Sequence, residues 1–215
     1  MHDPWVAFCA LQVYQIRKAV FNESTKFVKM EMTEAEQKFA RAALAVFQRY
    51  GVRKTTMEEI AVEAGVSKPT LYATFRNKDA ALGGSIRLAK SAVIKSVTDE
   101  WATTSSLPER LEVFFEKLVL AGFDMLHQSP DAQAFETAVG EASQSAINAM
   151  RAAEIDAVAG IFEDVQGLET LGLSPGDFAQ FVVTSAMNAK RLSQSREELQ
   201  DYLAVLKTSA VALLK

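Results

Sequence analysis

Residues 55–79 read TTMEEIAVEAGVSKPTLYATFRNKD, and this stretch decides the fold. Thr56 precedes Glu59 by three residues, the capping-box spacing that starts a helix. Gly65 then interrupts the pattern, Ser67 starts a second helix, and Pro69 falls in its first turn, where a missing N–H costs nothing. The stretch therefore predicts two short helices joined by a tight turn at Gly65. That is the spacing of a helix-turn-helix, whose second helix enters the major groove of DNA.

Helical patterns continue on both sides of this unit. Thr33 and Glu36 form another capping box, and Gly51 ends the helix that they predict over about 33–50. Asn77 or Asp79 opens a longer helix that runs to about residue 101. Further helices are predicted at about 108–127, 131–146, 148–170, 176–193 and 196–213. With no strand-like alternation bounded by hairpin turns, the predicted fold class is all-α: a three-helix head followed by a larger helical body.

Composition and charge limit the functions available to the chain. The 215 residues carry a net charge of -4, but residues 32–90 carry +4 and residues 91–215 carry -9. A basic front suits a polyanion, although a charge of this size is also common on an ordinary solvated surface. The single cysteine, Cys9, excludes an internal disulfide framework, and two distant histidines, His2 and His127, argue against a zinc site. A reducing, cytoplasmic location fits best.

The first 31 residues form a segment with a separate interpretation. The apolar run 5–16 is too short to span a bilayer, and the basic residues that follow it are in the wrong place for a secretory signal. Two alternatives stay open: an extra helix packed on the body, or a misassigned start, because Met30 and Met32 precede a strong helix start. We treat residues 1–31 as a leader and expect no membrane segment elsewhere.

Polar side chains gather on the second helix of the unit and around it. Short polar groups on this helix suit phosphates or base edges, and Tyr72 adds a hydroxyl beside them. Thr56 and Lys78 lie at helix starts, where backbone N–H groups also meet phosphate. For any one of these residues, a solvated surface side chain is the simpler explanation, but together they favour a DNA-facing surface. The short polar set comprises Ser67, Lys68, Thr70 and Thr74.

These residues carry a resemblance to a known family. Residues 34–82, above all the run from Gly65 to Asp79, resemble the N-terminal domain of the tetracycline-repressor (TetR) family, and the rest of the chain resembles it in length and helical character. The resemblance implies a homodimeric transcription factor, usually a repressor, that binds a palindromic operator in double-stranded DNA and a small-molecule effector. It implies a helix-turn-helix DNA-binding domain at 32–78 and an effector-binding and dimerisation domain at 79–215.

The resemblance also assigns roles by position. It implies that groove-facing sites are Lys68, Pro69, Thr70, Ala73 and Thr74, and that phosphate-contacting sites are Thr56, Ser67, Tyr72 and Lys78. Ala73 departs from the larger side chains often found there, since it offers only a methyl group, for instance to thymine.

The body offers candidates for an effector pocket and a dimer surface, each of which has ordinary core packing as its simpler explanation. The acidic body suggests an apolar or cationic effector. Large side chains that could line a pocket are Trp101, Phe115, Phe123, His127, Phe135 and Met150. Stripes on the last two helices that would pair with a second copy as a four-helix bundle include Phe178, Phe181, Val182, Leu199, Tyr202, Leu203 and Leu206.

Two other functions compete with DNA-binding regulation. An enzyme is disfavoured because the sequence contains no nucleophile elbow, P-loop, dinucleotide-binding glycine motif or metal-ligand cluster. We therefore expect no catalytic residues, no metal and no cofactor. The remaining alternative is a helical small-molecule-binding or adaptor protein whose helix-turn-helix no longer touches DNA.

Overall fold

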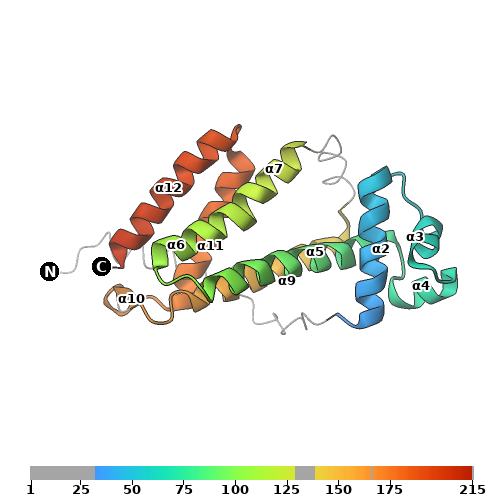
Figure 1. The fold of residues 1–215 in the computed structure, drawn as a ribbon, viewed down its shortest axis with the longest axis horizontal. Coiled ribbons are helices and arrows are strands. Elements are labelled where there is room, and N and C mark those ends of the chain that lie inside the picture. Colours follow the sequence, from blue (N-terminus) through green and yellow to red (C-terminus); the bar gives the residue numbers. More distant parts are fainter. Residues whose placement is uncertain (1–31, 129–138, 166, 215) are drawn as a thin grey trace. The chain divides into compact units, whose positions relative to one another are not determined.

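The computed structural model describes residues 32–128, 139–165 and 167–214, and within these ranges it contains helices and no strand (Figure 1). The predicted all-α class is confirmed. The predicted leader at 1–31 and the pocket candidate Phe135 lie outside the described residues. The described residues belong to one unit, Met32–Lys215, with two separate clusters of buried apolar side chains.

Three helices form the head, and their ends follow the predicted caps. They are α2 (Glu34–Tyr50), α3 (Met57–Ala64) and α4 (Lys68–Thr74). Thr33 and Thr56 complete the two predicted capping boxes, and Ser67 caps α4. Gly51 and Gly65 end α2 and α3 with φ angles of 78° and 64°, a region that side chains with a Cβ avoid.

The long helix α5 (Lys78–Trp101) belongs to both clusters of buried side chains. It begins at Asn77, whose side chain caps it. Its first turns contribute Ala81 and Leu82 to the head cluster, and its last turns contribute Ile94 and Val97 to the body cluster. The head cluster is completed by α2, α3 and α4 through Phe39, Val46, Phe47, Ile60, Leu71 and Phe75.

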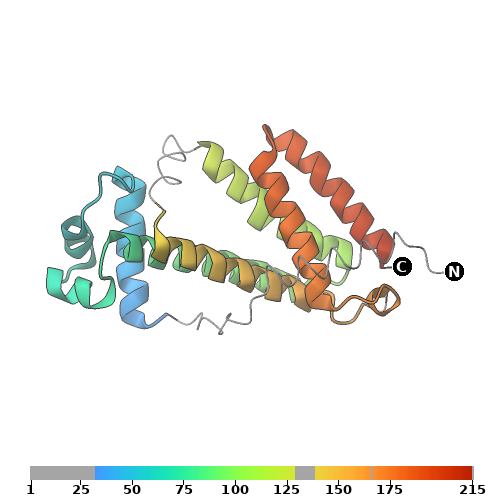
Figure 2. The same ribbon diagram turned by 180° about the vertical axis from the view of Figure 1, so that it is seen from behind.

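The body begins with one continuous rod. The helix predicted at about 108–127 is present as α6 (Leu107–Phe114), a π-helical stretch η1 (Phe115–Leu120) and α7 (Ala121–Gln128). α9 (Glu141–Gly160) lies beside α5 in both views of the ribbon (Figures 1 and 2). α11 (Pro175–Leu192) packs on α9, and α12 (Arg196–Leu213) packs on α11 and α6. The short α10 (Gly167–Thr170) precedes α11.

Two predicted boundaries in the body are wrong. We expected a break near residue 147, whereas α9 runs through it, because Ala146, Ile147 and Asn148 contain no helix breaker. We also expected a helix from 148 to 170, whereas α9 ends at Gly160 and turns follow before α10. Predictions at 176–193 and 196–213 are confirmed by α11 and α12.

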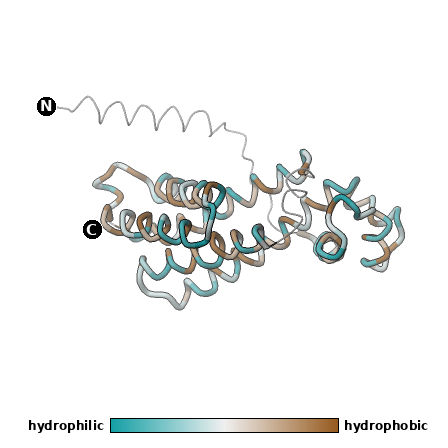
Figure 3. The backbone as a smooth tube through the Cα atoms, turned by 90° about the horizontal axis from the view of Figure 1, so that it is seen from above, coloured by the Kyte–Doolittle hydropathy of each residue, from teal (hydrophilic) through white to brown (hydrophobic). Residues whose placement is uncertain are grey.

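Hydrophobic and polar residues alternate along most of the described helices, as the tube of Figure 3 shows. The apolar faces meet in the body core, where Phe114, Phe162 and Phe178 are fully buried. Burial of this apolar surface is the main force that holds the helices together. Within the described ranges, no helix has the length and apolar character needed to cross a membrane.

Candidate nucleic-acid interface

The α3–α4 unit has the predicted sharp bend. Gly65 adopts the left-handed conformation, and the N–H of Val66 donates to the carbonyl of Ala61 at 3.0 Å. Ala61 is buried, so its small side chain fits where the helices converge. At the start of α3, Thr56 Oγ1 accepts from the N–H of Glu59 at 3.3 Å while the Glu59 carboxylate accepts from the N–H of Thr56 at 2.8 Å. The unit is therefore fixed at its start and at its turn.

The helix α4 turns one residue inward and the others outward. Leu71 is its buried residue, whereas Lys68, Pro69, Thr70, Tyr72 and Ala73 are exposed and Thr74 is half-buried. This arrangement brings the predicted groove-facing residues onto one short, outward-facing helix. It leaves Ala73 with only a methyl group to present.

Hydrogen bonds and one ion pair order this surface. Ser67 Oγ lies 2.8 Å from Thr70 Oγ1 and accepts from the N–H of Thr70 at 3.3 Å. Lys68 Nζ lies 2.6 Å from the Glu58 carboxylate, with both side chains well exposed. Such a surface pair contributes about 0–1 kcal/mol, so DNA phosphate can replace the carboxylate at little cost.

Lys78 has a different position from the other predicted phosphate ligands. It is half-buried, and its Nζ donates to the carbonyls of Arg53 at 3.1 Å and Thr55 at 3.0 Å. The side chain thus ties the start of α5 to the connector before α3. An ammonium has three N–H donors, so one remains for a phosphate.

Two exposed cations were not among the phosphate ligands predicted from the sequence. Arg53 and Lys54 lie in the connector just before Thr56 and are both exposed. The signal was present as two basic residues separated from a capping threonine only by Thr55, so that cations lie close to first-turn N–H groups. They add positive charge beside the N-terminus of α3.

Most of the predicted effector residues are buried. Trp101, Phe115, Phe123 and Met150 are buried, and the indole N–H of Trp101 donates to the Arg110 carbonyl at 2.8 Å. His127 is exposed at the end of α7 and stacks on Phe123, with ring centroids 3.8 Å apart. Two surface depressions lie elsewhere, one beside Arg53 and Lys78 and one around Thr104 and Lys207.

A buried group of charges in the body was not predicted. Glu154 of α9 is 1% exposed and pairs with Lys90 of α5. Burial lowers the pKa of Lys190 on α11 to about 8, and repulsion from Lys90 and Arg151 acts in the same direction. Attraction from Glu154 opposes this shift and only partly offsets it. No sequence signal marks this group, because its members meet only when α5, α9 and α11 pack together.

The predicted dimer stripes divide into buried and exposed residues. Five of them, Phe178, Val182, Leu199, Leu203 and Leu206, are buried inside the single chain, which is the ordinary core packing that the sequence left open. Phe181 and Tyr202 are 51% and 47% exposed. Further exposed apolar side chains on the same two helices are Leu192, Val205 and Leu213.

A bent pair of short helices, with the second helix outward and a basic connector beside it, has the geometry of a helix-turn-helix, the unit whose second helix can enter the major groove of DNA. Residues 40–82, which hold this unit, match the family described as "Bacterial regulatory proteins, tetR family". The predicted resemblance is confirmed over these residues: the chain has a tetR-family head. A comparison with curated proteins gave no match.

Solved structures extend the likeness to the body. A transcriptional regulator from Cytophaga hutchinsonii is 20% identical with a TM-score of 0.59, the match covering 82% of this chain and 94% of that one. The fatty acid degradation regulator FadR of Bacillus halodurans is 18% identical with a TM-score of 0.52, covering 86% and 96%. Reduced NemR of E. coli is 18% identical with a TM-score of 0.53, covering 81% and 96%. At these identities the likeness is one of fold.

Proposed function

We propose that the protein is a homodimeric repressor that binds a palindromic operator and is released by a small-molecule effector, acting in the cytoplasm and without enzymatic activity. The observation that carries the proposal is the exposed polar face of α4, whose opposite side buries Leu71 in the head cluster. A helix that turns lysine, threonine and tyrosine outward beside a basic connector suits an edge of duplex DNA.

The α4 surface divides the work between two kinds of contact. Lys68, Thr70, Ala73 and Thr74 are proposed to face base edges, with Pro69 shaping the first turn. Thr56, Ser67, Tyr72 and Lys78 are proposed to hold phosphates. Phosphate contacts fix the register of the head on DNA, and base contacts select the sequence.

The exposed apolar residues of α11 and α12 support a dimer. Phe181 and Leu192 recur on one side of α11, and Tyr202, Val205 and Leu213 recur along α12. Each pattern matches one helical face, and such a face in water favours a partner. Two copies joined by a two-fold axis would present two heads to successive half-sites.

A selection from random duplex DNA tests the proposal. The full chain is incubated with the random pool, and bound duplexes are amplified and sequenced. We expect an inverted repeat whose affinity falls steeply with salt, because each neutralised phosphate releases counterions. If no sequence is enriched and binding to duplex is absent at low salt, the proposal is wrong and the adaptor alternative is favoured.

The effector part of the proposal needs a separate readout. Once an operator is selected, candidate metabolites are screened for release of the operator from the protein in a fluorescence anisotropy assay. A repressor released by its effector must bind that effector more tightly off DNA than on it. Release by a compound that leaves DNA itself unchanged supports the proposal, whereas operator affinity that no compound alters removes its effector part.

A further inference from the structure

Asp79, in the first turn of α5, is bonded to the beginning of α9, 61 to 64 residues further along the chain. Its carboxylate accepts from the backbone N–H groups of Gly140 at 3.0 Å, Ala142 at 2.8 Å and Ser143 at 3.3 Å. The Ser143 hydroxyl donates to the same carboxylate. We call this set of contacts the Asp79 clasp.

The clasp supplies the cap that α9 lacks in its own sequence. The residue at the cap position of α9 is Gly140, which has no side chain to accept a hydrogen bond. A carboxylate is also favoured at the positive end of a helix dipole. Burial alone would raise the pKa of Asp79, but the hydrogen bonds from Ser143, Ala142 and Gly140 outweigh it and lower the pKa. Asp79 is therefore held as an anion by α9.

The close approach of α9 depends on two glycines. A Cβ at Gly140 would lie 2.7–2.9 Å from the Asp79 carboxyl group. A Cβ at Gly83, one turn further along α5, would lie 3.0 Å from the Ala142 carbonyl oxygen. Glycine at position 140 lets the backbone of α9 approach the Asp79 side chain, and glycine at position 83 lets the backbones of α5 and α9 approach each other.

The same turns of α5 also contact α4. A Cβ at Gly84 would lie 2.5 Å from the ring of Phe75, the buried residue that ends α4. Lys78, next to Asp79, bonds the connector before α3 through the Arg53 and Thr55 carbonyls. The first two turns of α5 are thus joined to the head by the hydrogen bonds of Lys78 and close packing at Gly84, and to α9 by the hydrogen bonds of Asp79 and close packing at Gly83.

We propose that the Asp79 clasp sets the orientation of the DNA-binding head on the body, and so the separation of half-sites that a dimer accepts. Asp79 is a positioning residue here, because it acts through α9 and α5 and not on DNA. The inference rests on the proposed function as a dimeric DNA-binding regulator.

The test measures tolerance of half-site spacing. Operators with the central spacer lengthened or shortened by one or two base pairs rotate one half-site about the DNA axis. We expect the wild-type protein to lose about tenfold or more in affinity on these operators, a loss similar to that of a mismatched base pair. Asp79→Asn and Gly140→Ala, which break the clasp from opposite sides, should reduce the loss to about threefold or less.

Matched variants separate positioning from general damage. Glu141→Gln removes an exposed first-turn carboxylate of the same helix without touching the clasp, and should keep the wild-type spacing preference. Substitutions in one half-site should weaken binding equally in wild type and clasp variants, because the α4 contacts are intact. Ser143→Ala removes one donor and leaves three backbone donors, so it serves if a stronger variant fails to fold.

The outcomes distinguish failure of the Asp79 clasp proposal from failure of the proposed DNA-binding function. Folded Asp79→Asn and Gly140→Ala variants that keep the full wild-type spacing preference overturn the inference while DNA-binding regulation stands. A wild-type protein that selects no operator overturns the proposed function itself. Partial loosening in Ser143→Ala, between wild type and Asp79→Asn, supports the clasp.

Discussion

At the scale of single residues, a substitution on the α4 surface and a substitution at Lys78 are expected to have different effects. Thr70 is exposed and bonds only its neighbour Ser67, so its removal leaves the head intact. Lys78 is half-buried and bonds two carbonyls, so its removal should affect the connector as well as the proposed phosphate contact. The two residues therefore need different measurements.

Thr70→Ala is expected to change base preference, by roughly 1–3 kcal/mol at the position that it reads. Lys78→Met, which keeps the aliphatic stem, should weaken binding to all sequences alike and reduce the slope of log affinity against log salt by about one. Both are measured by anisotropy titrations at several salt concentrations. An unchanged slope for Lys78→Met would assign that amine to the connector alone.

Lys190 is expected to cost stability at neutral pH. Its pKa is lowered to about 8 in the folded protein, so between pH 8 and its ordinary value of 10.5 the unfolded chain holds the proton more tightly. Stability should therefore rise with pH through that window, and the cost is fully present below pH 8. Lys190→Met should raise the free energy of unfolding by roughly 1–3 kcal/mol at pH 7, with the gain shrinking toward pH 10.5.

Denaturant unfolding at pH 7 and pH 9.5 checks this prediction. Lys95→Met is the control, since Lys95 is exposed and paired only with Asp99 on the same helix. Its effect should be small and independent of pH over the same range. A Lys190→Met variant less stable than wild type at pH 7 would show that the amine makes a net favourable contact.

At the scale of the elements, Gly65 and Gly160 allow one substitution to be compared in two backbone conformations. A Cβ added at either position would have no neighbouring atom within 4 Å, so packing contributes little to either change. Gly65 has a φ of 64°, whereas Gly160 lies within the helical span of α9. Gly65→Ala should destabilise the head by about 1 kcal/mol, and Gly160→Ala should stabilise α9 by about 0.5–1 kcal/mol.

Thermal unfolding and operator titration of the two variants check the pair. Gly65→Ala should also weaken operator binding, because strain at the bend displaces α4 from α3. Gly160→Ala is far along the chain from the head and should leave operator affinity unchanged. Equal effects of the two substitutions on stability would contradict the backbone argument.

The elements also show where sequence reasoning succeeds. The ends of α2, α3 and α4 could be predicted because Thr33, Thr56 and Ser67 cap their own helices, and each signal lies within four residues. The start of α9 could not, because its cap is Asp79, which is distant in sequence. The α4 surface was likewise predictable from local spacing, whereas Glu154 and Lys190 gain their partners only from tertiary packing.

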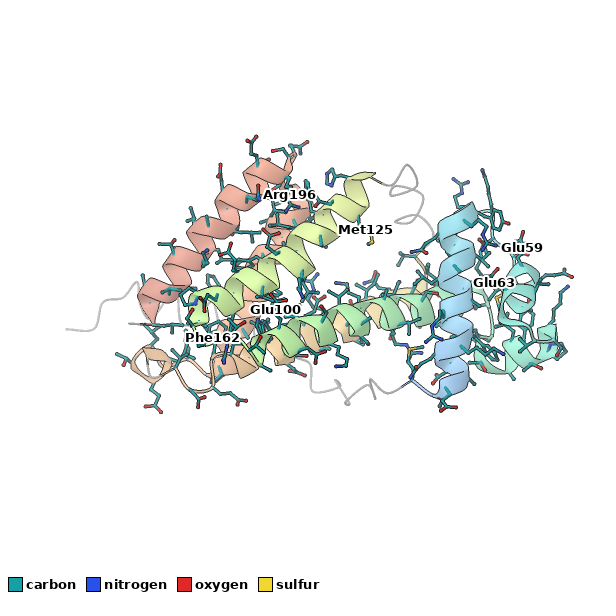
Figure 4. All side chains as sticks on the ribbon, viewed as in Figure 1. Glu59, Glu63, Glu100, Met125, Phe162 and Arg196 are labelled. Carbon is teal, nitrogen blue, oxygen red and sulfur yellow. The ribbon has the colours of Figure 1, made fainter. Side chains whose placement is uncertain are left out.

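At the scale of the whole molecule, ion pairs fix α12 to the helices before it, and some apolar side chains of α11 and α12 remain exposed. Arg196 of α12 pairs with Glu116 of η1 at 3.2 Å and with Asp124 of α7, so α12 is fixed to the rod (Figure 4). Lys207 pairs with Glu112 of α6 in the same way. With one side of α12 bonded to α6 and α7, its exposed residues Tyr202 and Val205 are available to a second copy.

Phe181→Asp combined with Tyr202→Asp is expected to convert the proposed dimer to a monomer. Both side chains are about half exposed in the single chain, so the substitutions should cost little within the chain while placing like charges opposite one another in a two-fold interface. Sedimentation velocity measures the change, and operator affinity should fall with it because two heads no longer bind together. Val62→Asp, at a 76% exposed site on α3, controls for loss of a surface apolar group and should remain dimeric. A double variant that sediments as wild type would place the interface elsewhere on the molecule.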